Sequence, residues 1–231
     1  MRTACLSALA LASSAALPAL AETPLDKARA APIEGPAYRF DLSFDDGELK
    51  AEAQVDPSKP EGERLTLVSP TEPELSESGA KRFRTLQENT TGDKIWCNQF
   101  NDNIPDDAKL ISESGEAAVY SFRPIATAEE ADMAKSYKHL TGRVTVSKEK
   151  PAILAYEMFA EKPFKPMLAA RVDSFNMKIS CDFAPDGRTY VKQMHVDLAG
   201  SAMMQRFSQM ETRVISNLVA LPGTETGAGQ R

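Results

Sequence analysis

The sequence predicts an α+β fold built mainly of antiparallel β-strands, in which short helices cover a curved half-barrel sheet. Two stretches carry this prediction. Residues 139–200 contain four runs of alternating apolar and polar residues, separated by proline, glycine and charged residues, which is typical of a β-meander. Residues 38–55 alternate in the same way on both sides of Asp45-Asp46-Gly47, which favours a β-hairpin.

The four runs of the meander are 139–147, 152–160, 168–183 and 189–198. The third run is long, and its apolar residues stand at even positions up to Val172 and at odd positions from Phe175. A strand cannot move its apolar side chains to the other face of a sheet without an extra residue, so a bulge or sharp bend is expected near Asp173-Ser174. Long, bent, half-apolar strands indicate a sheet with a concave side.

Shorter elements are expected before the meander. We expect strands at 64–69 and 94–100 (KIWCNQF), a hairpin of 108–112 with 117–122, and helices at 78–89 and 127–137. In the second helix, Thr127 stands three residues before Glu130, which resembles a capping box.

Residues 201–219 fit two structures. Met203, Phe207 and Met210 have helical spacing, whereas the β-branched residues Val214 and Ile215 favour a strand. We favour the strand, because every other part of the C-terminal half pairs in sequence order.

The first 21 residues have the pattern of a secretory signal peptide. Arg2 gives a basic start, 4–16 is a run of small and apolar residues, and Ala19-Leu20-Ala21 fits the small-residue cleavage rule. We therefore expect cleavage after Ala21 and a periplasmic protein. The apolar run is too short for a permanent membrane helix, and no second stretch is long enough, so no transmembrane segment is expected.

The remaining chain is expected to hold one domain. Residues 22–36, rich in alanine and proline, predict a flexible leader, 37–221 a single β-rich domain, and 222–231 a disordered tail. Because Arg2 is the one charged residue in the signal peptide, the rest has 26 basic and 33 acidic side chains and a formal charge of −7. This acidic balance argues against nucleic acid as a partner.

Two cysteines remain after cleavage, Cys97 and Cys181. An oxidising compartment favours their pairing, and a disulfide closing so long a loop would stabilise the fold by ~4 kcal/mol. The alternative is two separately buried thiols.

The architecture resembles that of the LolA/LolB-type periplasmic lipoprotein carriers. Two segments carry most of the resemblance, HLTGRVTVSKEKPAILAYEMFAEKPFKP and RTYVKQMHVDLAGSAMMQRF, and it extends over about residues 38–219. It implies an unclosed β-barrel with helices as a lid, whose interior holds acyl chains or another apolar ligand. The two cysteines and KIWCNQF depart from that family, so the identity of the cargo does not carry over.

Candidate ligand-binding residues come from the meander, in whose half of the chain the methionines cluster. Flexible thioethers suit a surface that accepts varied apolar ligands, although filling of a core is the favoured explanation for any single methionine. The candidate residues for binding a lipid or other apolar small molecule are Tyr156, Met158, Phe164, Met177 and Met194.

Enzymatic chemistry is not predicted. The sequence has no G-x-S-x-G, no H-E-x-x-H and no glycine-rich phosphate loop. His139 and His195 have no neighbours at metal-ligand spacing, so neither a metal site nor a cofactor is expected. Carboxylate pairs such as Asp45-Asp46 are explained by turn formation.

Three hypotheses follow for the function. The first is a non-enzymatic periplasmic protein that binds or carries a lipid or other apolar ligand in its half-barrel. The second is a structural or protein-interaction domain of the cell envelope whose core is fully packed. The third, a hydrolase, would require a buried acid or nucleophile in a cleft, and no motif in the sequence selects one.

Overall fold

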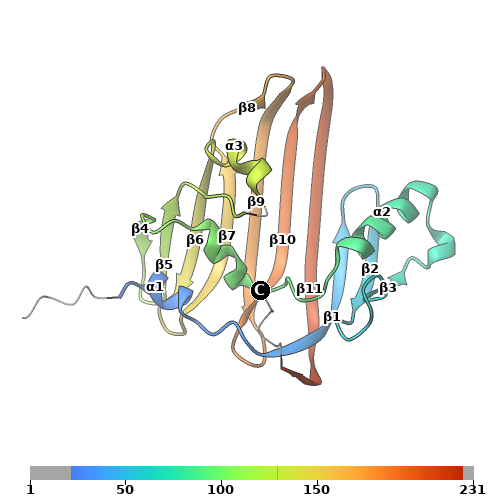
Figure 1. The fold of residues 1–231 in the computed structure, drawn as a ribbon, viewed down its shortest axis with the longest axis horizontal. Helices are drawn as coiled ribbons and strands as arrows, with labels where there is room; N and C mark the ends of the chain where they lie inside the picture. Colours follow the sequence, from blue (N-terminus) through green and yellow to red (C-terminus); the bar gives the residue numbers. More distant parts are fainter. Residues whose placement is uncertain (1–21, 129, 226–231) are drawn as a thin grey trace, which may run out of the picture.

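The protein is described by a computed structural model that covers residues 22–128 and 130–225, with side chains described to Pro222. The expected signal peptide, 1–21, and residues 226–231 of the expected tail lie outside the described residues. Eleven strands in the described part form one open antiparallel sheet (Figure 1). This confirms the predicted fold class.

The strands are β1 (Pro36–Asp45), β2 (Lys50–Val55), β3 (Leu65–Ser69), β4 (Lys109–Glu113), β5 (Ala117–Phe122), β6 (Leu140–Ser147), β7 (Ala152–Ala160), β8 (Phe164–Met167), β9 (Ala170–Phe183), β10 (Thr189–Ala202) and β11 (Gln205–Glu225). The α-helices are α1 (Pro24–Arg29), α2 (Glu77–Asn89) and α3 (Ala134–Tyr137), and the 3₁₀ turns are η1 (Glu72–Glu74), η2 (Cys97–Asn103) and η3 (Ala131–Met133).

The sheet joins two meanders. Its order is β3-β2-β1-β11-β10-β9-β7-β6-β5-β4, with β8 paired to β9 outside this path. Most neighbours in the sheet are also neighbours in the chain, but β1 pairs with β11, with Leu42 opposite Ile215. The early hairpin is thus attached to the last strand, and β3 and β4 form the two edges.

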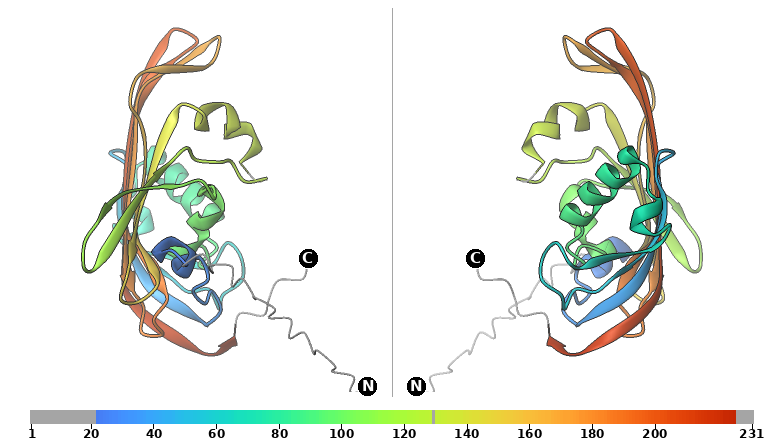
Figure 2. Two further views of the ribbon diagram at one scale, coloured as in Figure 1. Left: turned by 90° about the vertical axis from the view of Figure 1, so that its left-hand side faces the viewer. Right: turned by 90° about the vertical axis from the view of Figure 1, so that its right-hand side faces the viewer.

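The sheet is curved, and α1, α2, η2 and α3 lie on its concave face (Figure 2). Buried side chains on this face form two clusters. Core 1 combines residues of β5, β6, β7 and β9 with α1, η2 and Tyr137 of α3. Core 2 combines residues of β1, β2 and β3 with Phe83 and Leu86 of α2. The strands β9, β10 and β11 extend beyond the helices at one end (Figure 2).

The predicted bulge is present in β9. Ser174 lies opposite Ala199 and Val172 lies opposite Gly200, so Asp173 is the extra residue. The prediction is confirmed, and the bulge explains the change of parity, because Val172 and Phe175 face the same side of the sheet.

The strand favoured for residues 201–219 is also confirmed, but a turn at Met203-Met204 interrupts it. Residues up to Ala202 belong to β10, and β11 begins at Gln205. Because β11 continues to Glu225, residues 222–225 of the expected tail are part of the sheet, and that boundary was placed too early.

Residues 22–36, expected to be a flexible leader, contain a short helix. Residues 24–29 form α1, and its Leu25 and Ala28 are buried in core 1. Thr23 and Asp26 form a capping box at its start, which fixes the first turn. Further on, the guanidinium of Arg188 donates hydrogen bonds to the carbonyl oxygens of Ile33 and Pro36. A short capped helix with two buried side chains is too brief to produce a clear periodic pattern.

The strand expected at 94–100 is wrong. Trp96 makes one isolated bridge with Tyr190, and the turn η2 begins at Cys97. The carbonyl oxygen of Ile95 accepts the N–H of Val191 at 2.7 Å, so the segment meets β10 near the start of that strand. Because the bridge is antiparallel, the residues after Trp96 run toward Thr189, where β10 begins, and soon pass its end. A longer strand therefore has no partner there.

Two predicted helices have different outcomes. The helix expected at 78–89 is present as α2, which begins after the N-cap residue Ser76. The helix expected at 127–137 is shorter than predicted and consists of η3 and α3. The hydroxyl and backbone N–H of Thr127 do bond to the carboxylate of Glu130, but they close a loop ahead of the helical turns.

Candidate functional site

All five candidate ligand residues contribute to core 1 or pack against it. Tyr156, Met158 and Phe164 are buried inside it, and Met177 and Met194 are half-buried at its border. Strand pairing brings them together: Met158 lies opposite Met177, and Ile179 separates Met194 on β10 from Tyr156 on β7. The sequence therefore identified one cluster, but three of its five members are packed by the protein's own side chains.

Tyr156 lies at the centre of an aromatic group. Its ring stacks on Phe100 with centroids 4.8 Å apart and meets Phe122 at 6.0 Å. The Tyr156 hydroxyl is buried and has no hydrogen-bond partner among the described residues. Burial raises the pKa of this phenol, and the nearby Tyr137 and Glu130 add to the shift, so the hydroxyl is protonated at neutral pH.

Beyond core 1, an apolar strip continues along the concave face of the extended strands. Register places its members on one face: Leu198 lies opposite Phe175, Val196 opposite Met177, and Gly200 opposite both Val172 and Phe207. We call this set the apolar strip; it consists of Val172, Phe175, Met177, Val196, Leu198 and Phe207.

Every side chain of the apolar strip is half-buried. Val172, Phe175 and Met177 pack against core 1, so the strip and the core form one continuous apolar surface. The residues that alternate with them on the convex face include Asn176, Lys178 and Asp197, which are polar. The strip therefore faces the side on which the helices lie, and part of its apolar surface is open to solvent.

Gly200 shapes the end of the strip. A Cβ atom at this position would lie 2.3 Å from the carbonyl oxygen of Arg171 and 2.9 Å from the ring of Phe207. The missing side chain allows the Phe207 ring to lie against the strand. An open depression of about 430 Å³ occurs here, lined by Asp173, Ala199, Gly200, Arg206, Phe207 and Ser208.

A second cavity lies beneath α1 and is smaller. Its volume is about 140 Å³, and its lining includes Ala28, Ile153 and Arg188. Ligand pockets usually measure roughly 300–1,000 Å³, so this cavity is too small for a lipid or drug-sized molecule. Space for an apolar ligand is therefore better provided by the half-open strip than by this cavity.

A polar network holds the segment that carries η3 and α3. The carboxylate of Glu130 accepts hydrogen bonds from the buried amide of Asn103 at 2.7 Å and from the hydroxyl of Tyr137 at 2.8 Å. Burial opposes ionisation of Glu130, but these bonds and those from Thr127 outweigh it and lower its pKa below the usual 4.5. The network ties this segment to η2 on the concave face.

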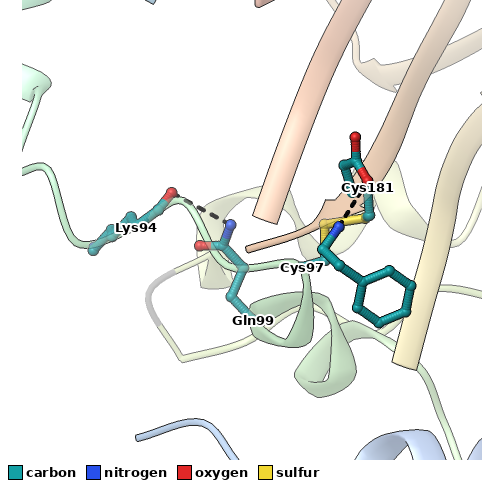
Figure 3. The surroundings of a disulfide bond; sticks show 6 residues. Lys94, Cys97, Gln99 and Cys181 are labelled. Atoms are coloured by element: carbon teal, nitrogen blue, oxygen red, sulfur yellow. Dashed lines mark hydrogen bonds between the residues drawn. A yellow bond between two sulfur atoms is a disulfide. The ribbon is translucent and has the colours of Figure 1, made fainter. Parts of the chain in front are cut away.

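The predicted disulfide is present. Cys97 at the start of η2 is bonded to Cys181 on β9, across 84 residues of sequence (Figure 3). The turn is supported by Gln99, whose side-chain amide donates to the carbonyl oxygen of Lys94. The bond holds η2, and with it Asn103 and Phe100, over core 1.

The two histidines do not share a site. The ring of His139 stacks on Phe164 with centroids 4.8 Å apart. Nδ1 of His195 lies 2.9 Å from the hydroxyl of Thr212 on the convex face. In residues 22–128 and 130–225, no group of three or more His, Cys, Asp or Glu side chains is arranged to hold a metal ion.

Sequence reasoning missed Phe207 and did not select Phe175 or Leu198 as candidates. Phe207 lies in the segment whose structure the sequence left open, so its face was unknown. The alternation of apolar and polar residues indicates which face of the sheet Phe175 and Leu198 occupy. Their partial exposure depends on which other segment covers that face.

Comparison with known proteins finds no matching family model, no matching curated protein and no matching solved structure. Within the described residues, no helix has the length and apolar character needed to cross a membrane.

Proposed function

We propose that the protein is an exported, non-enzymatic binding protein whose apolar strip takes a lipid acyl chain or another elongated apolar molecule. The observation that supports this most is the half-exposure of the six apolar side chains along the strip, in continuity with core 1. A contiguous apolar surface that a protein leaves partly open is typical of a site for an apolar partner.

The bound chain would lie along β9 and β10 and against Phe207. Phe175, Met177 and Leu198 supply contacts over a length of strand, and the thioether of Met177 can adjust to different chains. Tyr156, Met158 and Phe164 form the floor below the ligand. In this proposal they position the strip, because they are already buried by their own neighbours.

A fluorescent fatty acid such as cis-parinaric acid tests the proposal. Binding should raise its emission, and unlabelled fatty acid should reverse the change. Leu198→Gln places an amide on the strip and should weaken binding about tenfold, which corresponds to about 1.4 kcal/mol. Asp197→Gln is the matched control, because it places the same side chain at the adjacent position on the convex face.

Two results would contradict the proposal: no probe binding by a folded protein, or equal binding by the Leu198→Gln and Asp197→Gln variants. Native mass spectrometry of gently purified protein gives an independent reading, in which a co-purifying lipid should appear as an added mass.

Export is part of the same proposal, with the periplasm as the destination. It is supported by the pattern of residues 1–21 and by the pairing of Cys97 with Cys181, which requires an oxidising environment to persist. The intact mass of the processed protein should correspond to a chain beginning at Glu22. A mass that retains residues 1–21 would contradict it.

The second candidate is a structural or protein-interaction domain of the cell envelope. It is favoured by the interior of core 1, where Tyr156 and Ile153 are almost completely buried and the nearby cavity measures only about 140 Å³. On this alternative the parinaric acid probe does not bind, and crosslinking in the envelope recovers a protein partner.

A further inference from the structure

The turns β8–β9 and β10–β11 lie side by side at the far end of the longest strands (Figures 1 and 2). The backbone N–H of Met203 donates to the carbonyl oxygen of Ala169 at 2.9 Å, which joins the two turns. Four large apolar side chains project here, and we call them the apolar tip. Their exposed fractions are 65% for Met167, 103% for Leu168, 81% for Met203 and 99% for Met204.

The backbone at Met203-Met204 disfavours methionine. Both residues have positive φ, 49° and 67°, as in the two-residue hairpin turns that favour Asn-Gly. A side chain with a Cβ atom is strained in this region, and methionine lacks the local hydrogen bonds by which asparagine offsets that strain. Neither the turn nor the core explains two exposed methionines at this place, so a role outside the fold is indicated.

The charges around the apolar tip are mainly positive. Residues 161–173 and 200–208 contain four cations, Lys162, Lys165, Arg171 and Arg206, and two anions, Glu161 and Asp173. The carboxylate of Asp173 is paired with Arg171 at 2.6 Å. This end therefore has a net charge of +2 on a chain whose formal charge is −6, and it complements an anionic surface.

We propose that the apolar tip docks on an anionic phospholipid membrane. Leu168, Met203 and Met204 enter the boundary between headgroups and acyl chains, while Lys165 and Arg206 meet the lipid phosphates. Exposed apolar side chains flanked by basic ones are the combination that binds such interfaces, because burial of apolar area and attraction to anionic lipid act together. The inference does not depend on a ligand in the apolar strip.

Vesicle flotation of the whole purified protein tests this inference. The protein should float with vesicles of phosphatidylethanolamine and phosphatidylglycerol and much less with phosphatidylcholine vesicles. The double variant Leu168→Asp, Met204→Asp should reduce the bound fraction at least about tenfold, since it replaces insertion with charge repulsion. Lys165→Glu with Arg206→Glu should weaken binding as well, and high salt should reduce binding of the wild type.

The control variant is Val68→Asp, because Val68 is also exposed, at 61%, but lies on the edge strand β3 away from the tip. It should float like the wild type. Circular dichroism and thermal unfolding confirm that each variant is folded, and the turn positions carry no buried side chain whose loss would prevent folding.

Insertion itself is measured with Leu168→Trp. Emission of the new tryptophan should shift to shorter wavelength on anionic vesicles and be quenched by lipids brominated in the acyl chain. Failure of the wild type to float, flotation of the Leu168→Asp, Met204→Asp variant at the wild-type level, or capture of a protein by the tip without vesicle binding would each overturn the inference. Leu198→Gln should still float, which separates this inference from the proposed ligand site.

Discussion

Core 2 and the apolar strip are built from the same kind of strand, but only core 2 is closed by a helix. Along β1, Tyr38, Phe40, Leu42 and Phe44 alternate with polar residues and are 2–4% exposed. Along β9 and β10 the strip residues alternate in the same way and remain half-buried. Alternation thus determines which face of a sheet is apolar, whereas a separate segment determines whether that face becomes a core or a surface.

The helix that closes core 2 is fixed by polar contacts as well as by packing. The guanidinium of Arg82 on α2 donates a hydrogen bond of 2.7 Å to the carboxylate of Asp46, and the amide of Gln87 donates to the carbonyl oxygen of Leu65. These contacts hold Phe83 and Leu86 against the hairpin. The segment of η3 and α3 lies on the same side of the sheet as the strip (Figure 2), and hydrogen bonds of Glu130 tie this segment to Asn103 at the end of η2.

The largest loss of stability is expected from removal of the disulfide. This bond joins η2, the turn that follows α2 in the chain, to β9, the strand that carries part of the strip. Cys97→Ser or Cys181→Ser should lower the free energy of unfolding by about 4–5 kcal/mol, given a loop of 84 residues. Chemical denaturation with and without reductant measures this. Reductant should destabilise the wild type by a similar amount and leave either variant unchanged; an equal response of all three would contradict the stabilising role.

The comparison between the two regions is tested most directly by truncating one phenylalanine in each. Phe83→Ala removes a side chain that is 4% exposed and should cost about 3–5 kcal/mol, as for other buried phenylalanines. Phe175→Ala removes a half-buried side chain and should cost about 1–2 kcal/mol, because less apolar area leaves the interior. Equal costs, measured by urea unfolding, would mean that the strip is a closed core.

The sequence predicted the strands well where local alternation and turn chemistry agree. The hairpin at Asp45-Asp46-Gly47, the meander and the bulge at Asp173 follow from parity and from turn residues, which act within a few positions. The turn at Met203-Met204 could not be predicted, because neither residue favours the left-handed conformation that it adopts. The apolar tip was missed for that reason.

Errors in the fold came from contacts between distant segments. KIWCNQF has the composition of a strand, but it meets β10 at Tyr190, next to the start of that strand, and the residues after Trp96 run past its end. The leader was expected to be flexible, but Leu25 and Ala28 are buried against strands that follow more than 80 residues later. The structure brings the five candidate ligand residues together in one cluster, but their burial depends on η2 and α3, whose positions no local pattern specifies.

A smaller, pH-dependent change in stability is expected from Glu130, which holds the segment of η3 and α3. The pKa of Glu130 is lower in the folded protein than the usual 4.5, so its carboxylate binds fewer protons when folded than when unfolded. The stabilisation is therefore present above about pH 4.5 and is lost as pH falls through the folded pKa. Glu130→Gln should be less stable than the wild type at neutral pH, and the difference should shrink in acid.

Thermal unfolding of both proteins between neutral and acidic pH measures this difference. Glu129 is adjacent in the chain but lies outside the described residues, so Glu116→Gln on the turn before β5 is the better control and should follow the wild type at every pH. If the difference in stability between Glu130→Gln and the wild type is the same at all pH values, the network stabilises the fold through the geometry of its contacts and not through the charge of Glu130.

The smallest change in stability is expected from Tyr156→Phe, which tests whether the buried Tyr156 hydroxyl has a hydrogen-bond partner. The Tyr156 hydroxyl is buried without a partner among the described residues, and an unpaired buried hydroxyl destabilises a fold. Removing it leaves the stacking on Phe100 in place and should raise the free energy of unfolding by about 1 kcal/mol if nothing meets the hydroxyl. The same variant should bind parinaric acid like the wild type, because the proposed ligand contacts the strip above the ring. If the variant is destabilised and its affinity for the probe falls, the hydroxyl bonds to a ligand or a water, and the site extends from the half-open strip into core 1.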